Sequence, residues 1–260
     1  MEEKTAIIIP ARLASTRMPE KLLRDDTGRA LITYAIEAAE EARAASKEQI
    51  AEVIVATDNR RIAEVVTRYA ASAGIDTRTV MTRADHKTGT DRIAEAAADL
   101  PEAITKIINI QGDEPELPAN EILSVANLLA EHPGADLSTL VRPIYTREEF
   151  LDPNIVKVAL DAKGFCLIFS RAAIPYDRDN SRPAGHPFGY MHLGLYGYRR
   201  KVLSAYSSLP PSPLEEREKL EQLRALSAGL RIVAGISKYT GCGIDTEADY
   251  QAFAKRVRRA

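Results

Sequence analysis

Three cationic side chains stand close together just after the first apolar run of the chain. Residues 5–10 (TAIIIP) have the composition of a buried strand, and Arg12, Arg17 and Lys21 follow it within ten residues. In α/β sheets, ligands bind beside the carboxyl ends of the strands. Arg grips phosphate oxygens through two parallel hydrogen bonds, and Lys acts as a point charge. The spacing therefore predicts a triphosphate site in this loop.

Motifs for several other chemistries are missing. The chain has no GxxxxGK[ST] phosphate loop, no GxGxxG after the first strand, and neither HExxH nor GxSxG. Its four histidines are scattered, at His86, His132, His186 and His192. A histidine-based metal site is therefore not expected. Any metal should be hard and held by oxygen ligands, as Mg²⁺ is.

Composition indicates an ordinary water-soluble chain. Of 260 residues, 28% are charged and 45% hydrophobic, and the formal net charge is −2. Any site that attracts anions must therefore depend on locally clustered cations. The chain lacks the overall positive charge that is typical of nucleic-acid-binding proteins. Two distant cysteines, Cys166 and Cys242, imply neither a disulfide framework nor a zinc site. With no apolar stretch near the roughly 20 residues that span a bilayer, we expect a cytoplasmic protein with no membrane partner.

Strand-like and helix-like segments alternate over the first half of the chain. Strands are expected at 52–57, 77–81 and 106–110, and apolar residues at helical spacing lie between them. Ile32, Ala35, Ile36 and Ala39 illustrate that spacing. Asp58 or Asn59 could cap the next helix, and Thr90 is expected to cap the one after the loop 82–89. Alternating elements predict a mainly parallel, Rossmann-like α/β sheet flanked by helices.

The alternation of strand-like and helix-like segments ends at about Asp136. Strand-like runs at 137–140, 155–160, 165–169 and 193–198 follow one another with few helices. We interpret 137–212 as an antiparallel part of a single domain that spans 1–260. A last strand is expected at 231–236, and Ser212 and Thr246 each open a helix with an acidic residue three positions later.

Five segments, taken together in this order, carry a resemblance to one family. They are 8–12 (IIPAR) with 15–21 (STRMPEK), 81–86 (MTRADH) with 88–92 (TGTDR), 109–115 (NIQGDEP), 169–171 (FSR) with 192–199 (HLGLYGYR), and 220–224 (LEQLR) with 243–246 (GIDT). The chain resembles the 3-deoxy-manno-octulosonate cytidylyltransferases, also called CMP-Kdo synthetases, over nearly its whole length.

The resemblance implies a homodimeric, Mg²⁺-dependent enzyme of the nucleotidyltransferase fold, with the antiparallel part serving the substrate or the dimer. Such an enzyme joins CTP to the sugar acid Kdo, giving CMP-Kdo and pyrophosphate for lipopolysaccharide synthesis. The anomeric hydroxyl attacks the α-phosphorus, so no protein nucleophile is required. Catalysis then rests on positioning and charge neutralisation.

The resemblance also assigns roles to individual residues. The catalytic set is Arg12, Lys21, Asp113 and Asp245, of which the two aspartates would hold the metal. The CTP site would comprise Arg12, Ser15, Arg17, Lys21, Thr82, Arg83, Asp85, Thr90, Gln111 and Gly112. The sugar acid would meet Arg171, His192, Tyr196, Glu221 and Gln222.

The chain departs from the family pattern in places, and other interpretations stay open. Glu20 stands where relatives commonly have glycine, and Met191 stands where a basic residue is common. An 8-amino-Kdo derivative or another ulosonic acid could therefore be the substrate. A metal-dependent glycosyltransferase could use the DxD at 177–179. A catalytically silent nucleotide-binding protein is a third alternative, whereas a CMP-sialate synthetase would have a glycine-rich first loop.

Overall fold

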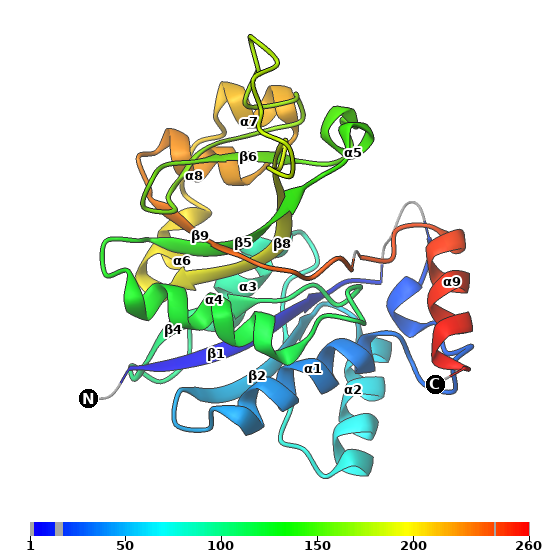
Figure 1. Ribbon diagram of the computed structural model, residues 1–260. Coiled ribbons are helices and arrows are strands. Elements are labelled where there is room, and N and C mark those ends of the chain that lie inside the picture. The colour runs from blue at the N-terminus through cyan, green and yellow to red at the C-terminus, as the bar shows by residue number, and fades with distance from the viewer. Residues whose placement is uncertain (1–2, 14–17, 242, 260) are drawn as a thin grey trace. The chain divides into compact units, whose positions relative to one another are not determined.

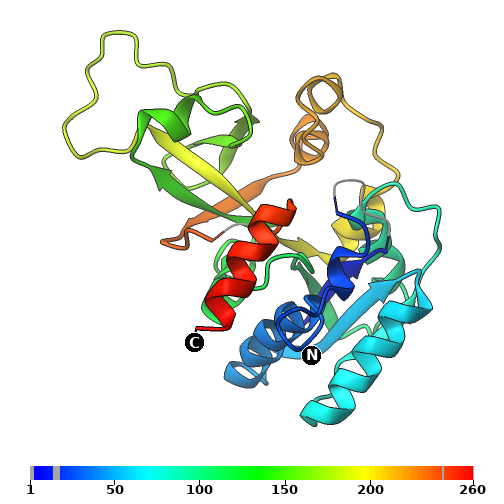
Figure 2. The same ribbon diagram turned by 90° about the vertical axis from the view of Figure 1, so that its right-hand side faces the viewer.

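The computed structural model describes residues 3–13, 18–241 and 243–259, and contacts divide the chain into two compact units (Figure 1; Figure 2). Unit 1 comprises Met1–Leu123 and Gly241–Ala260, and unit 2 comprises Ser124–Thr240. The boundary falls inside helix α4 (Ala119–Glu131). The single domain over 1–260 stays a prediction.

Unit 1 contains a parallel sheet. Its strands are β1 (Lys4–Ala11), β2 (Ile50–Thr57), β3 (Arg78–Met81) and β4 (Ile104–Asn109), in the order β3-β2-β1-β4. The middle of β1 is fully buried, which accounts for its continuous isoleucine run. The parallel α/β prediction for this part is confirmed.

Three helices pack against this sheet (Figure 1). They are α1 (Ile32–Ala45), α2 (Arg60–Ala73) and α3 (Gly89–Ala97). The four apolar residues that predicted α1 are at most 1% exposed. Asn59 caps α2 by accepting a hydrogen bond from the backbone N–H of Arg61, as one of the two expected alternatives.

The capping prediction at Thr90 is wrong. Thr88 is the N-cap of α3, and it exchanges hydrogen bonds with Asp91 in a capping box. A capping box needs a polar side chain three residues after the cap, and Thr90 has the apolar Ile93 there. Thr90 instead lies inside the first turn and is 6% exposed.

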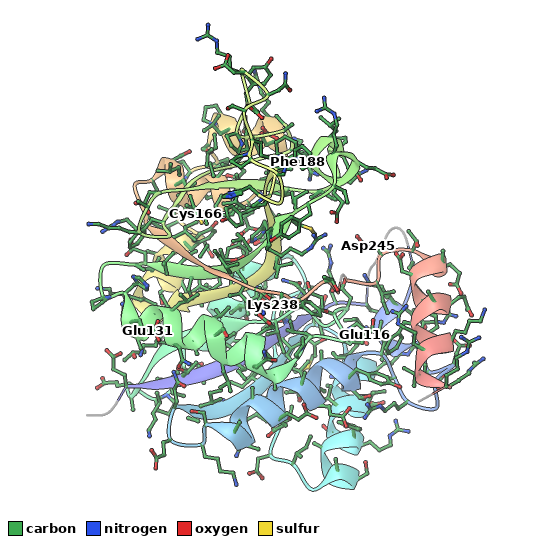
Figure 3. The ribbon with its side chains drawn as sticks, in the orientation of Figure 1. Glu116, Glu131, Cys166, Phe188, Lys238 and Asp245 are labelled. Carbon is green, nitrogen blue, oxygen red and sulfur yellow. The ribbon has the colours of Figure 1, made fainter. Side chains whose placement is uncertain are left out.

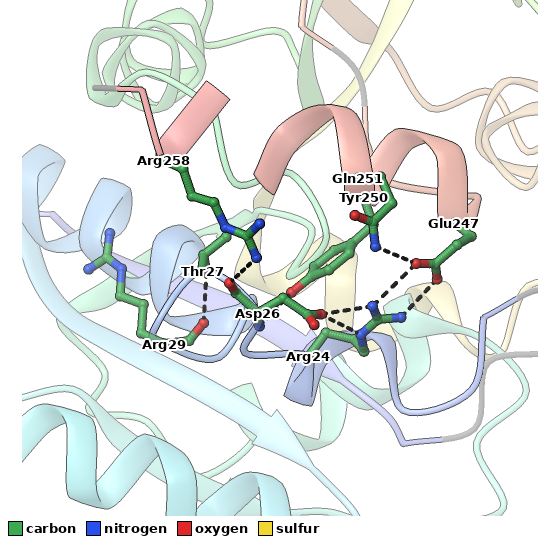
Figure 4. A network of polar contacts seen from close by, with 8 residues as sticks. All are labelled: Arg24, Asp26, Thr27, Arg29, Glu247, Tyr250, Gln251 and Arg258. Atoms are coloured by element: carbon green, nitrogen blue, oxygen red, sulfur yellow. Dashed lines mark hydrogen bonds and ion pairs between the residues drawn. The ribbon is translucent and has the colours of Figure 1, made fainter. Parts of the chain in front are cut away.

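The C-terminal helix α9 (Glu247–Val257) packs on the segment that follows the first loop. Tyr250 and Phe253 form an apolar cluster with Met18, Leu31 and Ile244. Polar contacts surround it: Arg24 pairs with Asp26 and Glu247, and its guanidinium lies 4.3 Å from the centre of the Tyr250 ring (Figure 4). The 3₁₀ turn η1 (Lys21–Leu23) and the start of α9 are therefore fastened together.

Unit 2 is built mainly from antiparallel strands. Strand β5 (Leu137–Ile144) pairs with β8 (Gly189–Arg199), which also pairs with β6 (Lys157–Leu160), and β6 pairs with β7 (Cys166–Ser170). Strand β9 (Ile232–Ile236) is parallel to β5. The helices of this unit are α5 (Arg147–Leu151), α6 (Arg200–Tyr206), α7 (Pro213–Glu218) and α8 (Gln222–Ser227). Ser212 caps α7 and Thr246 caps α9, each in the expected capping box.

Across the described residues, no helix combines the length and apolar character needed to cross a bilayer.

Candidate active site

A polar cavity of about 250 Å³ lies in unit 1 at the carboxyl ends of β1 and β4. The first turn of α3 and the segment before α9 complete its wall. This is the sheet edge at which α/β proteins bind ligands. Its lining residues are Pro10, Ala11, Arg12, Lys21, Leu22, His86, Thr88, Gly89, Arg92, Gln111, Gly112, Asp113 and Asp245.

Lys21 joins three parts of the cavity wall. Its ammonium lies 2.5 Å from Oδ2 of Asp113 and 3.8 Å from Oδ1 of Asp245, and it donates to the carbonyl of Ile244 at 2.5 Å. Only 9% of Lys21 is exposed, and Ile244, whose carbonyl it contacts, belongs to the apolar cluster around α9. Two carboxylates from distant parts of the sequence are thus gathered around one cation.

This arrangement fits an oxygen-ligated metal ion completed by a ligand. Both carboxylate oxygens lie within 3.8 Å of a single nitrogen, so modest side-chain rotation could bring them to one ion. Among the described residues, no cluster of three or more His, Cys, Asp or Glu side chains could hold a metal alone. Mg²⁺ commonly takes one or two carboxylates and fills its octahedron with phosphate oxygens and water.

Neither of the two aspartates serves as a helix cap. Prolines at 115 and 118 precede α4, which begins only at Ala119, so Asp113 caps no helix. Thr246 performs the capping of α9, and the Asp245 side chain just before it is half exposed (Figure 3). Next to Asp113, burial and the Asp113 charge raise the pKa of Glu114 to about 7.

The structure brings only part of the expected CTP set to the cavity. Arg12, Lys21, Gln111 and Gly112 line it, together with both aspartates. Ser15 and Arg17 lie outside the described residues. The remaining four are not among the lining residues: Thr82 and Thr90 are buried, and Arg83 and Asp85 are exposed.

Two ionisable residues that line the cavity, His86 and Arg92, were assigned no role in the sequence analysis, although both stand in segments that carry the resemblance. The ring of His86 contacts the carboxylate of Glu95. Burial alone would raise the pKa of Glu95, but the hydrogen bonds from His86 and from the backbone N–H of Arg83 have the larger combined effect. The pKa of Glu95 is therefore lowered. Arg92 is 3% exposed, donates to the hydroxyl of Thr82 and lies 3.5 Å from Asp58. An arginine in the first turn of a helix looks like surface charge in the sequence, and only the fold shows it to be buried.

The unusual Glu20 has a structural explanation. Its backbone φ is 54°, in the left-handed region that glycine adopts without strain. Its carboxylate pairs with Arg61 on α2, and that hydrogen bond lowers the pKa of Glu20. The extra negative charge is therefore neutralised locally rather than left free beside the cationic loop.

In unit 2, Arg171 is held by backbone carbonyls. Its Nε donates to the carbonyl of Glu218 at 2.8 Å and its Nη1 to that of Pro153 at 3.0 Å. The Glu218 carboxylate accepts from the Arg171 N–H and from the hydroxyl of Ser170. Nη2 has no hydrogen-bond partner among the described residues, so the end of the guanidinium remains able to receive an anion.

His192 and Tyr196 lie together on β8. Their ring centres are 5.1 Å apart, and the His192 ring meets Phe169 edge-to-face at 5.1 Å. Desolvation lowers the pKa of His192 to about 3, so the ring is neutral at pH 7. The buried hydroxyl of Tyr196 has no hydrogen-bond partner in the described part of the chain.

Glu221 and Gln222 are not a solvated helix face. Gln222 is 9% exposed, and the backbone carbonyl of Glu221 accepts from the hydroxyl of Tyr206 at 3.0 Å. Burial first, and then nearby groups that include Glu221, raise the pKa of Tyr196. Three residues of the expected sugar-acid set, His192, Tyr196 and Glu221, thus lie close to one another in unit 2.

The alternative metal motif at 177–179 lacks such an environment. All three residues are exposed, and the Asp177 carboxylate is engaged by the backbone N–H groups of Ser181 and Arg182. That surface loop offers no support for a DxD metal centre.

Comparison with known proteins identifies the class first. The family model for cytidylyltransferases matches residues 6–232, so the chain belongs to that family. Within it, relatives named 3-deoxy-manno-octulosonate cytidylyltransferase are 45% identical in Rhodopseudomonas palustris and 42% identical in Rhodopirellula baltica, each match covering 98% of both chains. The chain is therefore a member of the 3-deoxy-manno-octulosonate cytidylyltransferase family.

Solved structures agree with this. A CMP:2-keto-3-deoxy-manno-octonic acid synthetase, solved in complex with CTP, matches with a TM-score of 0.89 and 34% identity over 99% of both chains. A 4-diphosphocytidyl-2C-methyl-D-erythritol synthase from Anaerococcus prevotii matches with a TM-score of 0.63 at 13% identity, which shows the fold alone.

Proposed function

We propose that this chain transfers the cytidylyl group of CTP to the sugar acid Kdo, releasing pyrophosphate. The observation that carries the proposal is the gathering of Lys21, Asp113 and Asp245 in one cavity of a chain with full-length relatives of that name. In the reaction, the anomeric oxygen forms a bond to the α-phosphorus as the bond to pyrophosphate breaks. The proposal includes Mg²⁺ dependence, a cytoplasmic homodimer and a role in lipopolysaccharide synthesis.

The unit 1 residues suit the nucleotide half of this reaction. Lys21 and Arg12 would neutralise the triphosphate, and the N-terminal turn of α3 places its partial positive charge at the cavity wall. Asp113 and Asp245 would hold Mg²⁺, which supplies charge stabilisation at the phosphate oxygens. Lys21, which contacts Asp113 here, would then be able to contact the phosphates.

The unit 2 residues suit the acceptor half. Arg171 can direct the free end of its guanidinium to the carboxylate of the sugar acid. The neutral His192 and the unpartnered hydroxyl of Tyr196 suit sugar hydroxyls, which are uncharged. Together these groups can tell a polyhydroxylated acid from a simple carboxylate.

The test is a pyrophosphate-release assay with Mg²⁺, CTP and a panel that contains Kdo and its 8-amino analogue. We expect turnover with Kdo, and a loss of at least 100-fold in kcat for Asp113→Asn and for Asp245→Asn. The exposed Asp99→Asn serves as the matched control and should retain activity. Unchanged pyrophosphate release in both cavity variants would defeat the assignment, and turnover with another acid alone would redirect it.

A further inference from the structure

The β5–β8 pair contains an irregularity beside His192. Thr139 of β5 is opposite Tyr196, whereas the next residue, Leu140, is opposite Leu193, so β8 carries extra residues at this point. A bulge leaves backbone carbonyls without their regular ladder partners. Near this irregularity, the backbone carbonyl oxygens of Leu193 and Leu195 lie 3.2 and 2.8 Å from the hydroxyl oxygen of Thr139.

The same hydroxyl oxygen lies 3.1 Å from Nε2 of His192. A threonine hydroxyl has one proton to donate, and carbonyl oxygens can only accept. The proton must therefore go to one of the two carbonyls, with Leu195 at the shorter distance. The oxygen of Thr139 is then left as an acceptor, and Nε2 of His192 must carry the hydrogen that it receives.

We propose that Thr139 is a positioning residue that fixes His192 as the Nε2–H tautomer, so that its bare Nδ1 accepts a hydrogen bond from a hydroxyl group of the sugar acid. The opposite tautomer would place a lone pair of Nε2 against a hydroxyl whose proton is already committed. The inference rests on the proposed function for the identity of the ligand, but the tautomer rests only on the contacts around Thr139.

The surroundings of His192 agree with a neutral acceptor. Phe169 and Tyr196 flank the ring, and Nδ1 has no hydrogen-bond partner in the described part of the chain. The unpartnered hydroxyl of Tyr196 is the second polar group of this cluster. Nδ1 of His192 can accept a hydrogen bond, and the nearby Tyr196 hydroxyl can both donate and accept, so the pair suits two neighbouring sugar hydroxyls. The neutral His192 ring offers a carboxylate no positive charge. The carboxylate is thereby left to Arg171.

The tautomer can be read without any substrate. Long-range ¹H–¹⁵N spectra of the full chain labelled with ¹⁵N-histidine, with His192 assigned from the His192→Gln spectrum, should show a protonated Nε2 and a bare Nδ1. A protonated Nδ1, or a doubly protonated ring at pH 7, would overturn the inference even if the enzyme turns over Kdo. The converse outcome is a protein that shows a protonated Nε2 and a bare Nδ1 but no activity on Kdo. That result would support the assigned tautomer and contradict only the proposed function.

Variants separate positioning from simple support of the fold. Thr139→Val removes the hydroxyl at nearly constant volume and should mix the His192 tautomers and raise the KM for the sugar acid about tenfold, with the KM for CTP unchanged. Thr139→Ser should restore both readouts, and Thr240→Val, at an exposed position of the same unit, should alter neither. A Thr139→Val protein with a wild-type histidine spectrum would contradict the proposal, as would failure of Thr139→Ser to rescue.

Discussion

The side chain of Lys157 is completely buried in unit 2, and replacing it with methionine should destabilise the protein. Its ammonium donates to the carbonyls of Asp152 and Ile155, at 2.8 and 2.6 Å. Between them, the carbonyl of Pro153 accepts from Arg171. Three backbone carbonyls in the short segment after α5 thus accept hydrogen bonds from the side chains of Lys157 and Arg171. Methionine fills similar volume but removes both hydrogen bonds of the ammonium, and the Asp152 carbonyl then keeps only the backbone N–H of Ile155, at 3.2 Å.

The expected loss can be worked from those bonds. Hydrogen bonds to a charged group contribute about 1.5–3 kcal/mol each, and removal of the desolvated ammonium offsets part of that sum. We expect Lys157→Met to lower the free energy of unfolding by about 2–4 kcal/mol. Urea unfolding followed by circular dichroism measures it, with Lys163→Met, an exposed lysine in the adjacent β6–β7 turn, as the control.

The pH dependence gives the same prediction a second readout. Burial lowers the pKa of Lys157 below its usual 10.5, so the unfolded chain binds more protons as pH rises toward that value. The unfolding free energy of the wild type should therefore rise with pH in this window relative to Lys157→Met. A loss under about 0.5 kcal/mol, or parallel pH profiles, would refute the account of Lys157.

Three further changes test other parts of the structure. Burial raises the pKa of Glu114 to about 7, so in metal-free protein the unfolding free energy should fall by up to about 3 kcal/mol as pH rises from 4.5 to 7, and Glu114→Gln should flatten that fall. Glu20→Gly should leave the thermal midpoint and the KM for CTP close to wild type, because glycine takes the left-handed conformation freely; a large loss in either would show that the carboxylate has a role beyond its pairing with Arg61. Arg171→Lys should raise the KM for the sugar acid more than that for CTP, and equal changes would count against its assignment.

The regular elements of the chain could be predicted because their signals are local. The isoleucine run of β1 and the 3.6-residue spacing of α1 need no tertiary information. The cap of α3 was misplaced by two residues because Thr88 and Thr90 could both serve, and only the position of Asp91 distinguishes them. The turn η1 and the left-handed backbone at Glu20 depend on contacts with α2 and α9, which no local pattern reports.

The grouping of candidate-site residues could be predicted where a motif carries the chemistry, and the roles of these residues stay predictions. Lys21, Asp113 and Asp245 meet as the resemblance implied, although 223 residues separate Lys21 from the segment before α9. Burial was the missing information elsewhere. Arg92 reads as a charged helix residue and Lys157 as part of an alternating strand, yet both are enclosed by carbonyls or polar side chains that only the folded chain assembles.

The central claim is that Asp113 and Asp245 hold one metal ion against the triphosphate of CTP. Anomalous diffraction from crystals grown with CTP and Mn²⁺ in place of Mg²⁺ tests it directly. The account predicts a single manganese peak bonded to a carboxylate oxygen of each aspartate and to phosphate oxygens, with Lys21 displaced from Asp113. Bound CTP with no manganese at these carboxylates, or with the two aspartates too far apart to share an ion, would contradict it.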